Sequence, residues 1–233
     1  MTPPTALVTG ASQGLGLALA GALSGRGWRL VVDGRDPGRL AAAVAGLPRP
    51  ELATAVPGDV ADADHRAALA AAVPDRLDLF VANASELGPS PLLPLAQLPT
   101  AAFERVLRVN TVAPLALLQL VLPALRRAGG RVLLVSSDAA VEAYAGWGGY
   151  GASKAALDQL AAVLAVELPD LRVHAVDPGD MRTAMHQAAF PGEDISDRPD
   201  PASVVPALLR LVTGDLPSGR YRAADLAPLE AGR

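Results

Sequence analysis

The sequence predicts an α/β protein in which one parallel sheet is covered by helices on both faces. Three observations lead to this prediction: short apolar runs alternate with helical patterns, a glycine-rich turn joins the first run to the first helix, and polar residues end several runs. Strands that alternate with helices form parallel sheets, because each crossover returns the chain to the same edge. No linker rich in proline, glycine and serine divides the 233 residues, so we expect one domain over residues 1–233.

The first predicted strand, residues 6–8, leads through a glycine turn into a helical pattern over residues 17–23. Glycines let the backbone approach a pyrophosphate, and the start of the following helix presents unpaired N–H groups to it. Strand, glycine turn and helix together are the context that a dinucleotide-phosphate site requires. The residues predicted to form this site are Gly10, Ser12, Gln13, Gly14, Leu15 and Gly16.

The second predicted strand, residues 29–33, ends where such a fold meets the adenosine ribose. An acidic residue there binds a free 2′-hydroxyl, whereas an arginine suits a 2′-phosphate. Both Asp33 and Arg35 lie near this end, with Gly34 between them. We favour Arg35 as the phosphate contact, because its forked guanidinium matches phosphate geometry; a solvated turn arginine is the alternative.

The remaining elements continue the alternation. Further strands are predicted at residues 51–56, 77–81, 131–135, 171–176 and 220–222, and further helices at residues 38–45, 62–72, 100–108 continuing to 127, 155–168 and 202–211. In parallel sheets ligands bind beyond the carboxyl ends of the strands, where Asp59, Asn83 and Ser85 lie. Residues 184–201 have a mixed composition that suits a mobile flap over a site.

Tyr150 and Lys154 are four positions apart on one predicted helix and therefore lie on the same face. A tyrosine has a pKa of about 10, so it transfers protons poorly near neutral pH unless a cation stabilises the phenolate. Lys154 is placed to be that cation, and it is the only lysine among 20 basic residues. For an isolated Tyr-x-x-x-Lys pattern, a helix cap and a solvated lysine are the alternative.

Composition excludes several classes of protein. The chain has no cysteine, so disulfides and thiolate nucleophiles or metal ligands are excluded, and the three histidines form no cluster in the sequence; we predict no metal site. The net charge of −4 and the scattered arginines argue against nucleic acid and membrane surfaces as partners. The longest near-apolar run, residues 109–125, is interrupted and short for a bilayer. No signal-peptide pattern precedes the first strand, so we expect a cytoplasmic protein.

With these residues assembled, the whole chain resembles the short-chain dehydrogenase/reductase family, in its shorter branch of about 250 residues. The matching motifs are Thr9-Gly10-x-x-x-Gly14-x-Gly16, Asp59-Val60, Asn83-Ala84, Asn110, Ser137, Tyr150-x-x-x-Lys154, Pro178-Gly179 and Thr183. The resemblance implies a Rossmann-type, doubly wound parallel sheet of about seven strands. It also implies a homodimer or homotetramer built on the helices that contain Asn110 and Tyr150.

The resemblance further implies hydride transfer between a nicotinamide and a small carbonyl or alcohol substrate. Tyr150 would act as the acid/base and Ser137 would polarise the carbonyl oxygen. Lys154 would bind the nicotinamide ribose and help to lower the pKa of Tyr150 from about 10 to about 7, which needs roughly 4 kcal/mol. Asn110, whose buried amide needs partners, would hold a water that connects Lys154 to solvent. The remaining implied cofactor contacts are Gly34, Arg35, Asp59, Val60, Asn83, Ala84, Pro178, Gly179, Met181 and Thr183, with NADP favoured over NAD.

Two departures from the family pattern leave the substrate open. The usual Asn-Asn-Ala-Gly reads Ala82-Asn83-Ala84-Ser85, which adds a side chain beside the cofactor and narrows the site. The segment after Thr183 is short, and the usual Asp-Gly-Gly ending is lacking. Candidate pocket walls, each with core packing or exposure as the alternative, are Glu142, Tyr144, Trp147, Met181, Met185 and His186, whereas His65 and His174 are interpreted as structural.

Two rival functions follow from the same fold. A dinucleotide-sensing regulatory protein without turnover would not need the complete set of serine, tyrosine and lysine. A sugar-nucleotide epimerase of the family's longer branch would have a different glycine spacing and a larger C-terminal part. The sequence therefore favours an NAD(P)-dependent oxidoreductase.

Overall fold

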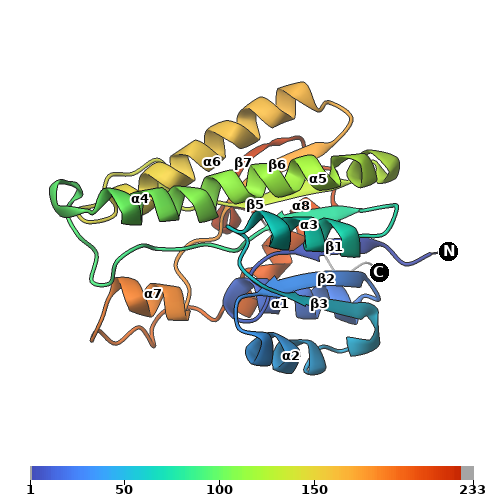
Figure 1. The fold of residues 1–233 in the computed structure, drawn as a ribbon, viewed down its shortest axis with the longest axis horizontal. Coiled ribbons are helices and arrows are strands. Elements are labelled where there is room, and N and C mark those ends of the chain that lie inside the picture. The colour runs from blue at the N-terminus through green and yellow to red at the C-terminus, as the bar shows by residue number, and fades with distance from the viewer. Residues whose placement is uncertain (1, 227–233) are drawn as a thin grey trace.

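The computed structural model describes residues 2–226, which form a single seven-stranded parallel sheet in the order β3-β2-β1-β4-β5-β6-β7 (Figure 1). The strands are β1 Thr5–Val8, β2 Arg29–Gly34, β3 Ala53–Pro57, β4 Leu79–Ala82, β5 Arg131–Val135, β6 Arg172–Asp177 and β7 Gly219–Arg222. The predicted doubly wound α/β sheet is thereby confirmed. Residues 227–233, where the family ending is lacking, lie outside the described part.

Helices cover both faces of the sheet (Figure 1). They are α1 Gly14–Gly25, α2 Pro37–Ala45, α3 Ala63–Ala72, α4 Thr100–Leu107, α5 Ala113–Ala128, α6 Gly148–Glu167, α7 Ala184–Ala189 and α8 Val205–Thr213. Helices α1, α2 and α8 contribute to one apolar cluster, and α3, α5 and α6 contribute to another. The sheet separates these two clusters and is therefore buried on both sides.

Alternate residues of the central strands supply the two clusters. Ala6 and Val8 of β1 pack in the cluster of α1 and α8, whereas Leu7 between them packs in the cluster of α3, α5 and α6. Successive side chains of a strand point to opposite faces, which produces this division. Because both faces are covered, the strands read as unbroken apolar runs rather than as alternating ones, and this explains why they stand out in the sequence.

The strand order reverses between β1 and β4. The chain builds outward from β1 through β2 to β3, then returns to place β4 on the other side of β1. The two connections diverge above the carboxyl ends of these neighbours, and a crevice opens at such a switch point. The glycine turn after β1 and the polar residues after β4 therefore meet at the same place.

Two predicted boundaries are wrong. The third strand begins at Ala53 rather than at residue 51, because Pro50–Leu52 forms a 3-10 turn in which the fixed proline φ favours a turn start. The helix predicted over residues 155–168 begins earlier, because Gly148 and Gly149 form the first turn of α6. A Cβ on Gly148 would lie 2.4 Å from the Cγ of Leu95, so a glycine there permits close packing.

The predicted helical stretch from residue 100 to residue 127 is present, with a π turn over Arg108–Val112 between α4 and α5. The segment 100–128 is long and apolar enough to cross a membrane by length and composition. Its side chains Leu117 and Leu125, however, are buried against the sheet, whereas Val112 and Leu120 point outward. The apolar character of this segment thus comes partly from the core and partly from an exposed face.

The segment predicted to be a flap, residues 184–201, contains a helix. Thr183 caps α7 by accepting a hydrogen bond from the backbone N–H of His186 at 3.1 Å. His186 is buried against the ring of Phe190, with 4.9 Å between the two centroids. These contacts give the segment a small core of its own, which its mixed composition did not indicate.

Candidate active site

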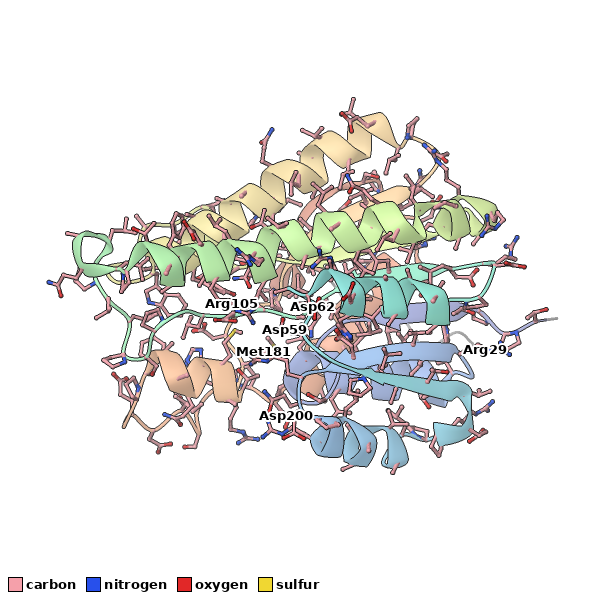
Figure 2. All side chains as sticks on the ribbon, viewed as in Figure 1. Arg29, Asp59, Asp62, Arg105, Met181 and Asp200 are labelled. Atoms are coloured by element: carbon pink, nitrogen blue, oxygen red, sulfur yellow. The ribbon has the colours of Figure 1, made fainter. Side chains whose placement is uncertain are left out.

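A cavity of about 640 Å³ lies at the carboxyl ends of the strands. Of the residues predicted to bind the cofactor or take part in catalysis, all line this cavity except Gly16 and Asn110. Residues scattered from position 10 to position 183 are thus brought to one place. Figure 2 shows Asp59, Arg105 and Met181, three of the residues that line the cavity, near one another.

The glycine turn after β1 is shaped by close backbone contacts. Gly10 has a φ of +67°, and a Cβ on it would lie 2.8 Å from the Cα of Ala84. A Cβ on Gly16 would lie 2.4 Å from the carbonyl oxygen of Gly10. Gln13 precedes the first turn of α1, which carries no side-chain cap. Backbone N–H groups at the start of α1 therefore remain available to an anion.

Asp33 stabilises the glycine turn by accepting a hydrogen bond from its backbone. The residue is 1% exposed. Its Oδ1 accepts a hydrogen bond from the N–H of Gly10 at 2.5 Å, and its Oδ2 lies 3.2 Å from Nε2 of His65. Asp33 therefore lines the cavity, but both of its carboxylate oxygens contact protein groups. Arg35, the other residue considered for the adenosine end, also lines the cavity, and its side chain is 70% exposed.

Arg35 belongs to a group of charged residues that the sequence did not reveal. Arg105 of α4 donates to Asp59 at 2.6 Å and to Glu86 at 2.9 Å. Nη1 of Arg35 lies 3.9 Å from the same Glu86 carboxylate. Two arginines and two carboxylates therefore lie together in the cavity wall. Both oxygens of Asp59 are engaged, because its Oδ1 accepts from the N–H of Ala61.

Asn83 joins the end of β4 to the glycine turn. Its amide nitrogen donates to the carbonyl oxygens of Thr9 at 2.9 Å and Gly10 at 3.1 Å. The donor side of the amide is therefore used within the protein. Its oxygen is the part that remains for a ribose, where the sequence predicts a contact.

Tyr150 and Lys154 lie on one face of α6, as predicted. Nζ of Lys154 is 5.5 Å from the centre of the Tyr150 ring and donates to the carbonyl oxygen of Val135 at 2.7 Å. Both side chains are buried at the cavity wall. The ammonium is thus held by the end of β5, close to the phenol.

The protein alone does not lower the pKa of Tyr150. Burial raises the pKa of Tyr150 to about 12, against hydrogen bonds with Ser137 and Ser85 that lower it. Burial also lowers the pKa of Lys154 to about 8, with the nearby carboxylate of Asp158 acting in the opposite direction. The expected value near 7 for Tyr150 therefore needs a further positive charge beside the phenol.

Ser137 begins a short turn after β5, and its hydroxyl is already engaged. Its Oγ donates to Oδ1 of Asp138 at 2.8 Å, and Oδ2 of Asp138 accepts from the hydroxyl of Tyr144 at 3.0 Å. Asp138 also lines the cavity and raises the pKa of Tyr150 by its charge. A substrate oxygen would have to draw the Ser137 hydroxyl away from this carboxylate.

Asn110 stands behind the cavity wall, in the π turn. Its Oδ1 accepts from the N–H of Glu86 at 2.8 Å, and its Nδ2 donates to the carbonyl oxygen of Glu86 and to Oγ of Ser153, both at 2.9 Å. The buried amide therefore has protein partners, as its burial requires. Both amide donors are used, so the predicted water would have to bind elsewhere on this residue.

The model of the short chain dehydrogenase family matches residues 4–194 of the chain. The chain belongs to the short-chain dehydrogenase family. The uncharacterized oxidoreductase YciK of Escherichia coli K12 is 32% identical over 221 residues, which cover 90% of this chain and 86% of that protein. A solved structure from Pseudomonas syringae is 34% identical, with a TM-score of 0.85 and 94% of both chains covered.

A structure from Escherichia coli CFT073, solved in complex with NADPH, is 29% identical and gives a TM-score of 0.88. It covers 96% of this chain and is itself covered to 97%. The likeness therefore extends past residue 194 to α8 and β7.

At the far end of the cavity this short-chain dehydrogenase has an aromatic wall. The Trp147 ring lies 5.8 Å from the ring of Tyr150 and 6.0 Å from that of Phe190, measured between centroids. Trp147, Met185 and His186 line the cavity as predicted. Glu142 and Tyr144 are not among its lining residues; instead their side chains bond to each other at 2.8 Å on the surface.

The other two histidines are structural, as interpreted from the sequence. His65 contacts Asp33, and His174 is buried in β6 with its Nε2 3.3 Å from the carbonyl oxygen of Leu216.

The segment Asp177-Pro178-Gly179 forms a turn after β6. Oδ1 of Asp177 accepts a hydrogen bond from the N–H of Gly179 at 3.0 Å, and the φ of Gly179 is +75°.

Sequence reasoning missed four charged or polar contributors to the site. Glu86 and Arg105 lie outside the family motifs, and only folding brings them to Arg35. Asp138 directly follows Ser137, so its nearness was visible, but its hydrogen bond was not. Ser85 was noticed as an added side chain beside the cofactor, not as a partner of Tyr150.

Proposed function

We propose that the protein is an NADP-dependent oxidoreductase that interconverts a carbonyl compound and a secondary alcohol. The observation that carries this proposal is the convergence of Tyr150, Ser137 and Lys154 on the cavity that also contains the glycine turn. A group that donates a proton, a hydroxyl that binds an oxygen and a cation thus surround one space beside a phosphate-binding turn. NAD is the alternative cofactor.

The residues present fit a dinucleotide phosphate. The crowding at Gly10 and Gly16 keeps the turn free of side chains, and the uncapped start of α1 supplies N–H donors. Arg35 is exposed beside the adenosine end, where its guanidinium would pair with a 2′-phosphate. Asp33, which would favour a free 2′-hydroxyl, is turned inward to Gly10.

A bound reduced nicotinamide would supply the hydride for the carbonyl carbon. Tyr150 then donates its proton to the carbonyl oxygen, while the Ser137 hydroxyl turns from Asp138 to the same oxygen and stabilises the developing charge. Lys154 holds positive charge next to the phenolate that remains, and its bond to Val135 fixes its position. The reverse reaction starts from the phenolate, which removes the alcohol proton.

The cavity favours an apolar substrate next to the reacting groups. Leu87, Trp147 and Met185 line it, together with the carboxylates of Asp138 and Asp177. The segment 184–201, which carries Met185 and His186, is placed to act as a flap, and its helix gives that flap a defined form. We therefore propose a neutral ketone or aldehyde with an apolar substituent as substrate.

The exposed apolar residues of α5 and α6 support a homodimer or homotetramer. Leu120 of α5 and Val163 and Val166 of α6 are exposed in the single chain. Apolar residues grouped on two neighbouring helices mark a surface that a second copy would cover. A cytoplasmic location stays a prediction from the sequence.

The proposal is tested by mixing the protein with NADPH and a panel of aldehydes, ketones and alcohols, and by following the absorbance of the reduced nicotinamide. We expect turnover of apolar ketones and little turnover of carboxylates. Binding of NADPH without turnover of any compound would favour the dinucleotide-sensing alternative.

Arg35→Ala tests the choice of cofactor. The parent protein should bind NADPH more tightly than NADH, and the variant should lose most of that preference, about tenfold to a hundredfold, because a charge-assisted bond to the 2′-phosphate is removed. Arg39→Ala is a matched control, since Arg39 contacts Gln13 on the same rim of the cavity. Equal affinities for both cofactors in the parent would show the assignment of Arg35 to be wrong.

A further inference from the structure

Ser85 brings a hydroxyl to the reacting end of Tyr150. It follows β4, lines the cavity together with Tyr150, and acts to lower the pKa of Tyr150. Its Oγ also lies 3.3 Å from Oδ1 of Asn110. The family pattern has a glycine at this position, so neither the pattern nor the resemblance gives this side chain a role. Two hydroxyls, those of Ser85 and Ser137, therefore meet the phenol.

The direction of the Ser85 hydroxyl follows from the orientation of Asn110. The backbone N–H of Glu86 can only donate, so the Asn110 atom 2.8 Å from it must be the amide oxygen. The same oxygen faces Ser85 and can only accept. The proton of Ser85 thus points to Asn110, and the lone pairs of its oxygen are left for the hydroxyl proton of Tyr150.

We propose that Ser85 is a catalytic residue whose hydroxyl turns from Asn110 to the oxygen of Tyr150 when that oxygen gives up its proton. This inference rests on the proposed function, because it assigns Tyr150 the role of acid/base. In carbonyl reduction the Tyr150 proton forms the new O–H bond of the alcohol. Ser85 keeps its own proton and only rotates, so it stabilises the phenolate without exchanging atoms with it.

The exchange of partners is favourable on both sides. A hydrogen bond to a charged oxygen is roughly twice as strong as one between neutral groups, and the bond that Ser85 gives up is a long one. Asn110 is not left unpaired, because Glu86 still donates to its oxygen. Ser153 accepts from Nδ2 of Asn110 and donates to the backbone oxygen of Tyr150, so the amide is fastened to the helix that carries the phenol.

The expected narrowing of the site by Ser85 is the competing explanation, and three substitutions separate it from a hydroxyl effect. Ser85→Ala removes the hydroxyl and keeps the Cβ, Ser85→Gly removes both, and Ser85→Thr keeps the hydroxyl. Ser136→Ala is the matched control, because Ser136 is a buried serine of the same cavity whose Oγ has no hydrogen-bond partner within the described residues.

The measurement is kcat/KM for alcohol oxidation with NADP⁺ as a function of pH. The rate rises with pH as the phenolate forms, so weaker stabilisation of the phenolate moves this rise to higher pH. We expect Ser85→Ala and Ser85→Gly to move it upward by about one pH unit and to lower kcat/KM about tenfold below it. Ser85→Thr should stay close to the parent, and Ser136→Ala should leave the position of the rise unchanged. A Ser85→Ala profile identical to the parent's would overturn the inference, as would a change in Ser85→Gly alone.

A second readout does not depend on turnover. The chain has three tyrosines, so carbon-13 labelling of the tyrosine ring gives three signals, and Tyr150→Phe identifies the one of interest. With NADP⁺ bound, the Tyr150 signal should titrate at a higher pH in Ser85→Ala than in the parent. The same titration in both would refute a role for Ser85. If the parent oxidised no alcohol, the proposed function would fall, and this titration would still decide about Ser85.

Discussion

Asp138 opposes the roles proposed for Ser137 and Tyr150. Its carboxylate holds the Ser137 hydroxyl at 2.8 Å and raises the pKa of Tyr150 by its negative charge. Both effects oppose the proposed mechanism, in which Ser137 reaches a substrate oxygen and Tyr150 carries charge for part of the cycle. In the proposed mechanism, Asp138 therefore lowers the rate of the reaction that Ser137 and Tyr150 carry out.

Asp138→Ala should remove this effect. We expect kcat/KM for ketone reduction to rise about threefold to tenfold, because the Ser137 hydroxyl no longer has to leave a carboxylate. Without the negative charge the pKa of Tyr150 falls, so the rise of alcohol oxidation with pH should move to lower pH.

The matched control for Asp138→Ala is Glu142→Ala, because Glu142 also accepts a hydrogen bond from Tyr144 but does not contact Ser137. Steady-state rates across the pH range check the prediction. A profile that stays in place, or moves to higher pH, would contradict it.

Gly151, which has no side chain, lets the helix α6 pack closely against the turn that follows Ser137. A Cβ on Gly151 would lie 2.5 Å from the carbonyl oxygen of Ala139, in the turn that follows Ser137. Helix and turn therefore approach more closely than any other residue at position 151 permits. This contact sets the separation between Tyr150, which precedes Gly151 on the helix, and Ser137.

Gly151→Ala should push α6 away from the turn. We expect a loss of about 1–3 kcal/mol in the free energy of unfolding and a fall in kcat of at least about tenfold, because a misplacement of the proton donor is felt directly in the rate. Urea denaturation and steady-state rates measure the two effects.

Gly21→Ala provides the control for Gly151→Ala. Gly21 lies on the surface of α1, and a Cβ there meets no atom within 4 Å. The substitution Gly21→Ala should raise the free energy of unfolding by up to about 1 kcal/mol, as expected for alanine in place of glycine in a helix. If both variants behaved alike, close packing at Gly151 would not be the reason for the glycine.

Elements with a strong pattern were predictable from the sequence, and contacts between elements were not. All seven strands were foreseen, and the central ones stand out because burial on both faces gives unbroken apolar runs. The reach of Gly148 to Leu95 and the core that His186 forms with Phe190 depend on segments distant in space or weak in pattern. The cavity residues were found through motifs, whereas Glu86 meets Arg35 and Arg105 only after folding.

The outer face of α5 and α6 gives the whole molecule an apolar surface. Leu120, Val163 and Val166 are exposed on it, and a homo-oligomer would bury them. Because Tyr150 and Lys154 sit on the opposite side of α6, such an interface would hold the helix that carries the catalytic groups.

Leu120→Arg combined with Val166→Arg should shift the protein from oligomer to monomer, because burying two charges at an interface is unfavourable. Sedimentation velocity measures the change. Ala41→Arg on α2, at the other face of the sheet, is the control and should leave the parent's state intact. A parent that sediments as a monomer would refute the proposed assembly.

The proposed function requires that Tyr150 transfers the proton in a cavity that binds a nicotinamide dinucleotide. Tyr150→Phe removes one hydroxyl and keeps the ring that packs against Trp147. The most direct measurement compares this variant with the parent in the rate of ketone reduction and in the affinity for NADPH. We expect the rate to fall at least about a hundredfold while the affinity stays within about threefold of the parent's. A Tyr150→Phe variant that reduces ketones as fast as the parent would show that Tyr150 is not the proton donor.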